Sequence, residues 1–302
     1  MAKNLSHIGE FGLINEIRKT FSHSRSVIQG IGDDAAALDV EGGGYLLLTT
    51  DMLVENEHFT YQDKPGAIGH KAMACSISDI AAMGGIPRHA VVSLGAPAKT
   101  NYSFIRGLMG GLKKTARHFG VDIVGGDTVK APKIVINVSL TGHVKRSHLV
   151  TRGGARRGDI IFVTGPLGRS FKNGKHLSFT PRLKAAQFLA CHFKPKAMID
   201  ISDGLIADLG HILKESRRGA EIDATQIPKN PGATLDEALY DGEDFELLFT
   251  LSPAKAVRLK RLRHKNFSFY EIGRITSASD NVTLIDNRGR ASKLKVKGFE
   301  HF

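Results

Sequence analysis

The placement of aspartates in apolar or glycine-rich surroundings is the feature that most constrains this chain. They fall in five segments: two follow a GIG turn, one ends LLLTT, one lies in an apolar helical pattern, one follows IVGG and two lie in IDISDG. In order, these residues are Asp33, Asp34, Asp51, Asp79, Asp127, Asp200 and Asp203. A buried carboxylate without a partner costs several kcal/mol or takes up a proton. A fold that buries these segments together therefore needs a cation among them.

Each aspartate taken alone also has an ordinary structural interpretation. Asp33 and Asp34 suit a turn, Asp51 suits a strand-end cap, Asp203 suits a helix N-cap, and Asp79 suits a lysine partner. Five segments of the same character are explained more simply by shared coordination of Mg²⁺, which takes hard oxygen ligands and bridges carboxylates to phosphates. The neighbouring glycines would let a polyphosphate approach the backbone N–H groups closely.

Familiar phosphate-binding and metal motifs do not fit. Residues 168–175 (GRSFKNGK) have five residues between the glycines where a P-loop needs four, and His176 replaces its Ser/Thr. GIGDDA lacks the third glycine of a dinucleotide fingerprint. Cys75 and Cys191 form no CxxC or zinc pattern. The pattern indicates metal-assisted phosphate chemistry on another scaffold, with Arg152 offering a planar fork to phosphate oxygens.

The order of apolar patterns predicts mixed α and β structure in two domains. Helices are expected over residues 11–21, 66–85 and 102–119, and strands over residues 45–50, 89–96, 121–127 and 134–144. The 302 residues exceed what one core usually holds. Because the glycine-rich, basic segment TRGGARRGD precedes a new strand, we place the boundary there, giving domains of residues 1–147 and 148–302.

The net charge of +12 is concentrated in the second half. Residues 1–150 hold 16 basic and 13 acidic residues, whereas residues 151–302 hold 26 and 17. Basic and apolar residues interleave over residues 255–265, a pattern that suits a polyanion such as nucleic acid, although a solvated helix face is the commoner meaning. We see no run of roughly 18 apolar residues and no signal core at the start, so we expect a soluble, cytoplasmic protein without a membrane partner.

The motifs together resemble the thiamine-monophosphate kinase family, within the ATP-binding superfamily of aminoimidazole ribonucleotide synthetase. In order, they are GIGDDAAAL, TTDMLVENEHF, ISDIAAMGGIP, GGDTVKAP, TRGGARRGD, VTGPLG, IDISDGLIADL, GEDFELLF and GFEHF, between residues 10 and 302. The resemblance implies a two-domain α/β fold of the α+β type with mixed sheets. It also implies a homodimer in which the N-terminal sheet pairs with that of a second subunit.

The resemblance implies several Mg²⁺ ions, with ATP and thiamine monophosphate as bound substrates. The implied metal ligands are Asp34, Thr49, Thr50, Asp51, Asp79, Asp127, Asp200 and Asp203. The implied ATP contacts are Gly126, Asp127, Arg152 and Ser202, and the implied contacts of thiamine monophosphate are His58, Glu243 and Phe299. For Phe299 two interpretations stay open, because a terminal aromatic residue either stacks on the substrate ring or caps the core.

The implied reaction is direct, in-line transfer of the γ-phosphoryl group of ATP to the phosphate of thiamine monophosphate. An ionised phosphate acceptor needs no general base, so no catalytic acid–base residue is expected. Two alternatives remain: a superfamily member with another acceptor, or a polyanion-binding protein on an inactive scaffold. The chain lacks the N-terminal reactive cysteine of selenophosphate synthetases, and its aspartates are intact, so we do not expect nucleic acid as a partner. The segment after VTGPLG departs from the family, being shortened and basic before Pro181 and Arg182.

Overall fold

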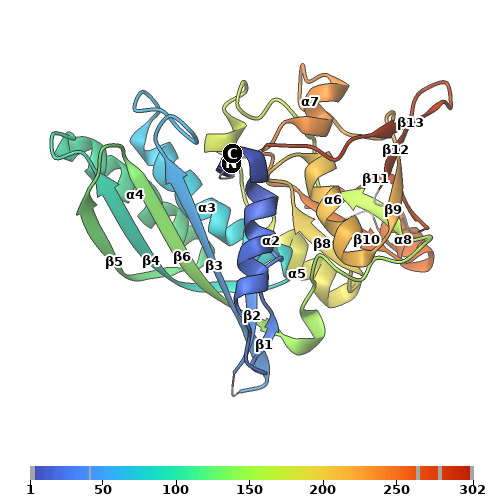
Figure 1. Ribbon diagram of the computed structural model, residues 1–302, viewed down its shortest axis with the longest axis horizontal. Helices are drawn as coiled ribbons and strands as arrows, with labels where there is room; N and C mark the ends of the chain where they lie inside the picture. The colour runs from blue at the N-terminus through green and yellow to red at the C-terminus, as the bar shows by residue number, and fades with distance from the viewer. Residues whose placement is uncertain (1–3, 41, 263–265, 278–280, 300–302) are drawn as a thin grey trace.

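The first half of the chain forms a six-stranded mixed sheet (Figure 1). The computed structural model describes residues 4–40, 42–262, 266–277 and 281–299. In spatial order the strands are β1 (Val27–Gln29), β2 (Ala36–Val40), β3 (Gly44–Val54), β6 (Val135–Lys145), β4 (Ile86–Ala96) and β5 (Asp122–Lys130). Neighbouring strands are antiparallel except for β4 and β5, which are parallel. The outer strand β5 lies at the edge farthest from the second half of the molecule (Figure 1).

The second half forms a seven-stranded mixed sheet. In spatial order its strands are β13 (Ala291–Leu294), β12 (Val282–Ile285), β9 (Gly219–Asp223), β11 (Tyr270–Thr276), β7 (Ile160–Val163), β10 (Leu247–Leu251) and β8 (Ala197–Asp200). Only the pair β12 and β9 is parallel among the described strands of this sheet. Strand β7 is apolar throughout, and both faces of β10 are buried, as expected where a sheet is covered on two sides.

Helices cover the sheets and connect them. They are α1 (Leu5–Ile8), α2 (Glu10–Thr20), α3 (Pro65–Ala82), α4 (Tyr102–Phe119), α5 (Leu183–His192), α6 (Leu205–Ser216), α7 (Leu235–Tyr240) and α8 (Pro253–Arg261), with 3-10 turns η1 (Arg146–His148) and η2 (Lys175–Leu177). Helix α4 begins where the Asn101 side chain accepts the N–H of Ser103, and it ends at Gly120 in the left-handed conformation. Among the described residues, no helix is long and apolar enough to cross a membrane.

Helix α3 lies at the centre of the molecule. It packs against β3, β6 and β4 of the first sheet and also against α5 and β8 of the second half. Its crossing with α4 is very close, because a Cβ atom at Gly111 would lie 2.0 Å from the backbone oxygen of Gly66. One hydrophobic cluster joins the two halves, since it contains Leu47 and Ile136 from the first sheet and Phe249 from the second.

The structure confirms the mixed α/β class and changes several element boundaries. Helix α4 has the bounds that the sequence predicts, whereas β3 continues past Asp51 to Val54 and β5 continues past Asp127 to Lys130. Both aspartates therefore lie inside strands and not at their ends, because pairing with the neighbouring strands continues beyond them. The division at residues 147 and 148 stays a prediction; it falls between the last strand of the first sheet and the first strand of the second.

Candidate active site

Three predicted aspartates meet between the two sheets. Asp34 lies in the loop before β2, Asp79 near the end of α3, and Asp200 at the end of β8. One carboxylate oxygen of each lies within 4.8 Å of the corresponding oxygen of the others. Segments that are far apart in sequence therefore deliver three acidic groups to one small volume, which we call the carboxylate cluster.

Hydroxyl groups from two neighbouring elements hold these carboxylates in place. Thr49 Oγ1 on β3 donates to Asp79 Oδ2 at 2.5 Å, and Ser78 Oγ on α3 donates to Asp200 Oδ2 at 2.5 Å. Ser76, two residues earlier on α3, donates to Asp51 Oδ2 at 2.6 Å. Because all three hydroxyls come from regular elements, the carboxylates are oriented before any ligand arrives.

Burial and mutual repulsion make the cluster costly to ionise. Burial, followed by the charge of Asp34, raises the pKa of Asp200 to about 8. Burial raises the pKa of Asp51 to about 6, despite the hydrogen bond from Ser76. The pKa of Asp79 is raised well above its ordinary value, first by burial and then by the charges of Asp51 and Asp200. Without a cation, the folded chain retains protons here that the unfolded chain would release.

Arg152 meets this charge on one side. Its Nε and Nη2 atoms lie 3.2 and 2.6 Å from Asp34 Oδ1, and its backbone N–H donates to Asp33 Oδ2 at 3.1 Å. One guanidinium cannot neutralise several carboxylates. Burial and the neighbouring Asp34 still raise the pKa of Asp33 to about 7.

The carboxylate cluster fits a divalent metal ion. Within the part of the chain that the structure describes, Asp34 Oδ2 is buried and meets no hydrogen-bond donor. An acceptor of this kind is costly unless a cation satisfies it. The atoms available to coordinate a metal ion around Asp34 Oδ2 are carboxylate and hydroxyl oxygens, which are the ligands that Mg²⁺ prefers.

A second acidic group lies beside a cavity of about 520 Å³. Asp203, Asp208 and His211 place ligand atoms within 4.8 Å of one another, and Asp203 lines the cavity together with Thr50 and Arg152. Asp208 already accepts the backbone N–H groups of Asp203 and Gly204, both at 3.1 Å. Sequence analysis missed Asp208 and His211, although their spacing of three residues on a helix places them on the same side.

Two of the predicted substrate contacts are joined by a residue that sequence analysis missed. Lys71, on α3, is wholly buried and forms an ion pair with Glu243. Its Nζ atom also donates to the backbone oxygen of His58 at 2.8 Å. The His58 Nδ1 atom accepts the N–H of Val54 at 3.1 Å, which assigns the proton of the neutral ring to Nε2. A lysine in a helical pattern rich in apolar residues was the available signal.

The structure does not bring Gly126 and Asp127 to the carboxylate cluster of the same chain. Both are exposed on β5, and β6 and β4 separate that strand from β3. Three strand spacings amount to roughly 14 Å. Asp127 is also aligned through Ser93 and Asn137 with Met52, so its side chain shares the exposed face of Thr50 and Met52, opposite to that of Asp51.

The remaining predicted residues lie around the cavity side of the site. Ser202 and Asp203 are half-buried after β8, and Phe299 donates its backbone N–H to Asp203 O at 3.0 Å. Phe299 is 44% exposed, and its contact with the substrate stays a prediction. Residues 300–302 of the closing GFEHF motif lie outside the described residues.

Family models and known proteins agree with this architecture. Residues 32–144 match the N-terminal domain of AIR synthase related proteins, and residues 163–285 match the C-terminal domain. Fold and carboxylate cluster thus define a two-domain protein of the AIR synthase-related class. The thiamine-monophosphate kinase of Buchnera aphidicola subsp. Schizaphis graminum is 34% identical over 97% of this chain and 98% of its own length. That of Aquifex aeolicus is 33% identical over 99% of each chain.

A solved structure supports the same assignment. AaThiL complexed with AMPPCP and TMP matches with a TM-score of 0.86 and 33% identity over 100% of both chains. The chain belongs to the thiamine-monophosphate kinase family.

The carboxylate cluster predicts that Mg²⁺ stabilises the folded protein. At one hundred times its dissociation constant a ligand adds about 2.7 kcal/mol, so we expect Tm to rise by roughly 5 °C. The unfolded carboxylates ionise near pH 4, whereas Asp51 and Asp200 ionise near 6 and 8 in the fold. In EDTA their contribution to stability therefore falls between about pH 4 and pH 8, and the Mg²⁺-dependent rise should be larger at pH 8 than at pH 6. Differential scanning calorimetry measures both.

Two matched variants show whether the Mg²⁺ response comes from the carboxylate cluster or from acidic side chains in general. Asp79→Asn should lose most of the Mg²⁺ response while being at least as stable as the wild type in EDTA, because asparagine stays neutral where burial and the neighbouring carboxylates oppose ionisation of Asp79. Asp122→Asn, which changes an exposed aspartate at the start of β5, should keep the full response. An unchanged response in Asp79→Asn would remove this residue from the metal site.

Proposed function

We propose that this chain transfers the γ-phosphoryl group of ATP to the phosphate of thiamine monophosphate, giving thiamine diphosphate and ADP. The observation that carries the proposal is the buried carboxylate cluster, oriented for divalent cations in a chain of this family. Asp34, Asp79 and Asp200 would hold Mg²⁺, with Asp51, Thr49 and Thr50 adjoining and Asp203 holding a further ion. Mg²⁺ would neutralise the phosphates of both substrates and align them.

The chain's own residues have distinct parts in this proposal. Arg152 and Ser202 would bind the nucleotide phosphates beside the cavity, where the guanidinium offers two parallel donors. Glu243 would face the positively charged ring of thiamine monophosphate, His58 would donate from Nε2 to its phosphate, and Phe299 would stack on a ring. The acceptor oxygen is already ionised near neutral pH, so positioning and charge neutralisation replace a general base. The cytoplasmic location stays a prediction.

An assay with two acceptors tests the proposed function. Purified protein is incubated with ATP and Mg²⁺, together with either thiamine monophosphate or thiamine, and thiamine diphosphate is measured by chromatography. We expect product from the monophosphate alone, because the alcohol of thiamine would need a base to remove its proton. Equal turnover of free thiamine would refute the proposal.

The stereochemistry at phosphorus tests direct transfer. One in-line displacement inverts the transferred phosphorus, whereas a phosphorylated enzyme intermediate would invert it twice. With ATP made chiral at the γ-phosphorus by oxygen isotopes, we expect inversion at the β-phosphorus of thiamine diphosphate. Net retention would point to a phosphorylated side chain and contradict the direct mechanism.

We further propose that the active unit is a homodimer whose subunits complete each other's sites. Asp127 lies too far from the cluster of its own chain, yet it shares the exposed face of the first sheet with Thr50, which lines the 520 Å³ cavity. The same face exposes apolar side chains to 41–59% of their area, namely Leu48, Met52, Val91 and Val129. An apolar sheet face of this size suits a second copy. Gly126 and Asp127 of one subunit would then approach the nucleotide of its partner.

Mixing two inactive variants tests the shared site. If Asp127 acts across the interface, a heterodimer of Asp79→Asn and Asp127→Asn chains has one doubly substituted site and one intact site. Random exchange makes half of the dimers heterodimers, so the mixture should regain about a quarter of wild-type activity. If both aspartates act in the same chain, every site carries one substitution and the mixture stays inactive. Co-expression with two different affinity tags isolates the heterodimer for measurement.

A further inference from the structure

Lys71 is a buried cation that the proposed transfer of phosphate does not use directly. It is wholly buried and is the largest such side chain of α3. Its ammonium group pairs with Glu243, donates to His58 O at 2.8 Å, and lies 5.4 Å from the centre of the Phe171 ring. It therefore connects two of the three chain segments that are proposed to contact thiamine monophosphate, one from each half of the molecule.

The backbone around Glu243 is strained. Glu243 has φ of 64° and Phe245 has φ of 50°, a left-handed conformation that costs non-glycine residues energy. Such strain persists only where the surroundings fix the segment, and it is concentrated at functional sites. The structure therefore maintains this segment in a geometry that a relaxed loop would not adopt.

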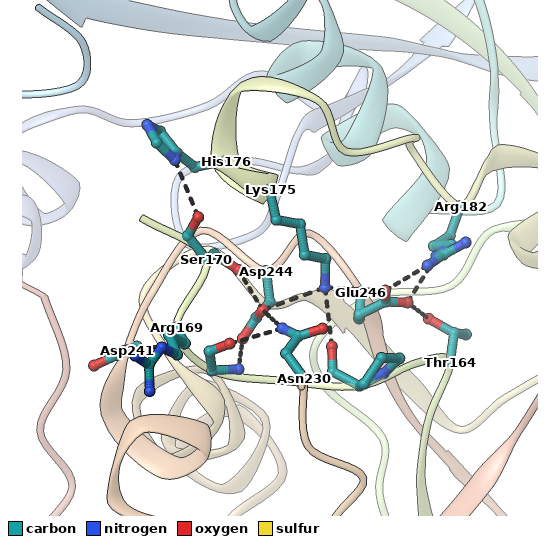
Figure 2. A network of polar contacts seen from close by, with 12 residues as sticks. Thr164, Arg169, Ser170, Lys175, His176, Arg182, Asn230, Asp241, Asp244 and Glu246 are labelled. Atoms are coloured by element: carbon teal, nitrogen blue, oxygen red, sulfur yellow. Dashed lines mark hydrogen bonds and ion pairs between the residues drawn. The ribbon is translucent and has the colours of Figure 1, made fainter. Parts of the chain in front are cut away.

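A network of polar contacts surrounds Asp244, the residue that follows Glu243 in the strained segment (Figure 2). The buried Asp244 carboxylate accepts the Gly168 N–H at 2.6 Å, the Ser170 hydroxyl at 2.5 Å and the Asn230 amide at 3.1 Å, and it lies 3.3 Å from Lys175 Nζ. Two of these groups, Ser170 and Lys175, come from the shortened basic segment after VTGPLG. That segment also supplies Phe179, which stacks on Phe245 with ring centres 3.9 Å apart. These contacts fix the backbone beside Glu243, and the ion pair with Lys71 directs its carboxylate.

Stability alone does not account for the Lys71–Glu243 pair. Taking an ammonium and a carboxylate out of water costs several kcal/mol each, and well-packed apolar residues in their place are often as stable or more stable. Several neighbours of Lys71 on α3, such as Ile68 and Ala72, are apolar and buried, so an apolar side chain would suit the helix at this position. The pair is better explained by the direction that it gives to a carboxylate and to the His58 turn.

We propose that Lys71 is a positioning residue for thiamine monophosphate, acting through Glu243 and the backbone of His58. This inference rests on the proposed function, because it takes Glu243 and His58 as contacts of that substrate. One carboxylate oxygen of Glu243 and the backbone carbonyl of His58 both contact the same ammonium group. The two substrate-binding side chains, which come from different halves of the chain, are thereby set in one geometry before the substrate binds.

Steady-state kinetics of Lys71→Met test the proposal. Methionine keeps the unbranched length and removes the charge. We expect KM for thiamine monophosphate to rise at least tenfold, with KM for ATP changed less than twofold, since the metal and nucleotide groups do not contact Lys71. The matched control, Lys113→Met on the exposed side of α4, should leave both KM values unchanged. A merely structural defect would raise both KM values together and would overturn the proposal.

A double-mutant cycle with Glu243→Gln shows whether Lys71 acts through Glu243. If it does, adding Lys71→Met to Glu243→Gln should change KM for thiamine monophosphate less than twofold, although each single substitution raises it strongly. Independent effects would instead multiply and would refute the mechanism. The double variant carries no unpaired buried charge, so it should fold even if Lys71→Met alone does not.

Direct binding separates this inference from the proposed function. Calorimetric titration with thiamine monophosphate gives the same comparison without turnover. A wild type that binds this ligand but forms no thiamine diphosphate would refute the proposed reaction. The double-mutant cycle, measured as dissociation constants, would then still decide the role of Lys71. A wild type that does not bind it would refute both.

Discussion

The structure depends on carboxylates that are held together against their own repulsion. Two like charges about 4 Å apart repel by on the order of 4 kcal/mol in a partly screened site, which is a large share of the 5–15 kcal/mol that stabilises an ordinary fold. Asp34, Asp79 and Asp200 can be tolerated at their mutual distance only as protonated groups or around a cation. Hydroxyls from β3 and α3 fix these side chains, and apolar packing on both sides prevents the segments from moving apart.

Helix α3 connects this constraint to substrate recognition. Its last turns carry Ser76, Ser78 and Asp79 to the carboxylate cluster, and its second turn carries Lys71 to Glu243. The glycine crossing of α3 with α4 leaves no side-chain layer between the two backbones, so the position of α3 is tightly constrained by its neighbour. A single rigid element thus relates the proposed metal site to the proposed site for thiamine monophosphate. The distance between the phosphates of ATP and thiamine monophosphate would then depend on how far apart Lys71 and Asp79 lie along this helix.

The sequence predicted which residue types form the candidate site better than it predicted how those residues are arranged in space. An aspartate in an apolar or glycine-rich segment is a strong local signal, and Asp34, Asp79 and Asp200 do meet. Asp127 carries the same signal but lies at an outer edge, because strand order and the face that a side chain takes depend on pairing between distant segments. Lys71 was missed because one lysine hardly alters an apolar helical pattern. The network around Asp244 was missed because its donors come from a segment whose glycines and lysines resemble an ordinary surface loop.

The hydrophobic cluster that joins the two sheets has a consequence for how the chain folds. Leu47, Ile136 and Phe249 belong to one continuous core, although the AIR synthase-related models assign the first two and the last to different domains. Cutting the chain between those domains would expose apolar surface on each piece. The halves should consequently melt in one cooperative transition, and neither should persist as an autonomous folding unit. The two family domains would then form a single cooperative folding unit.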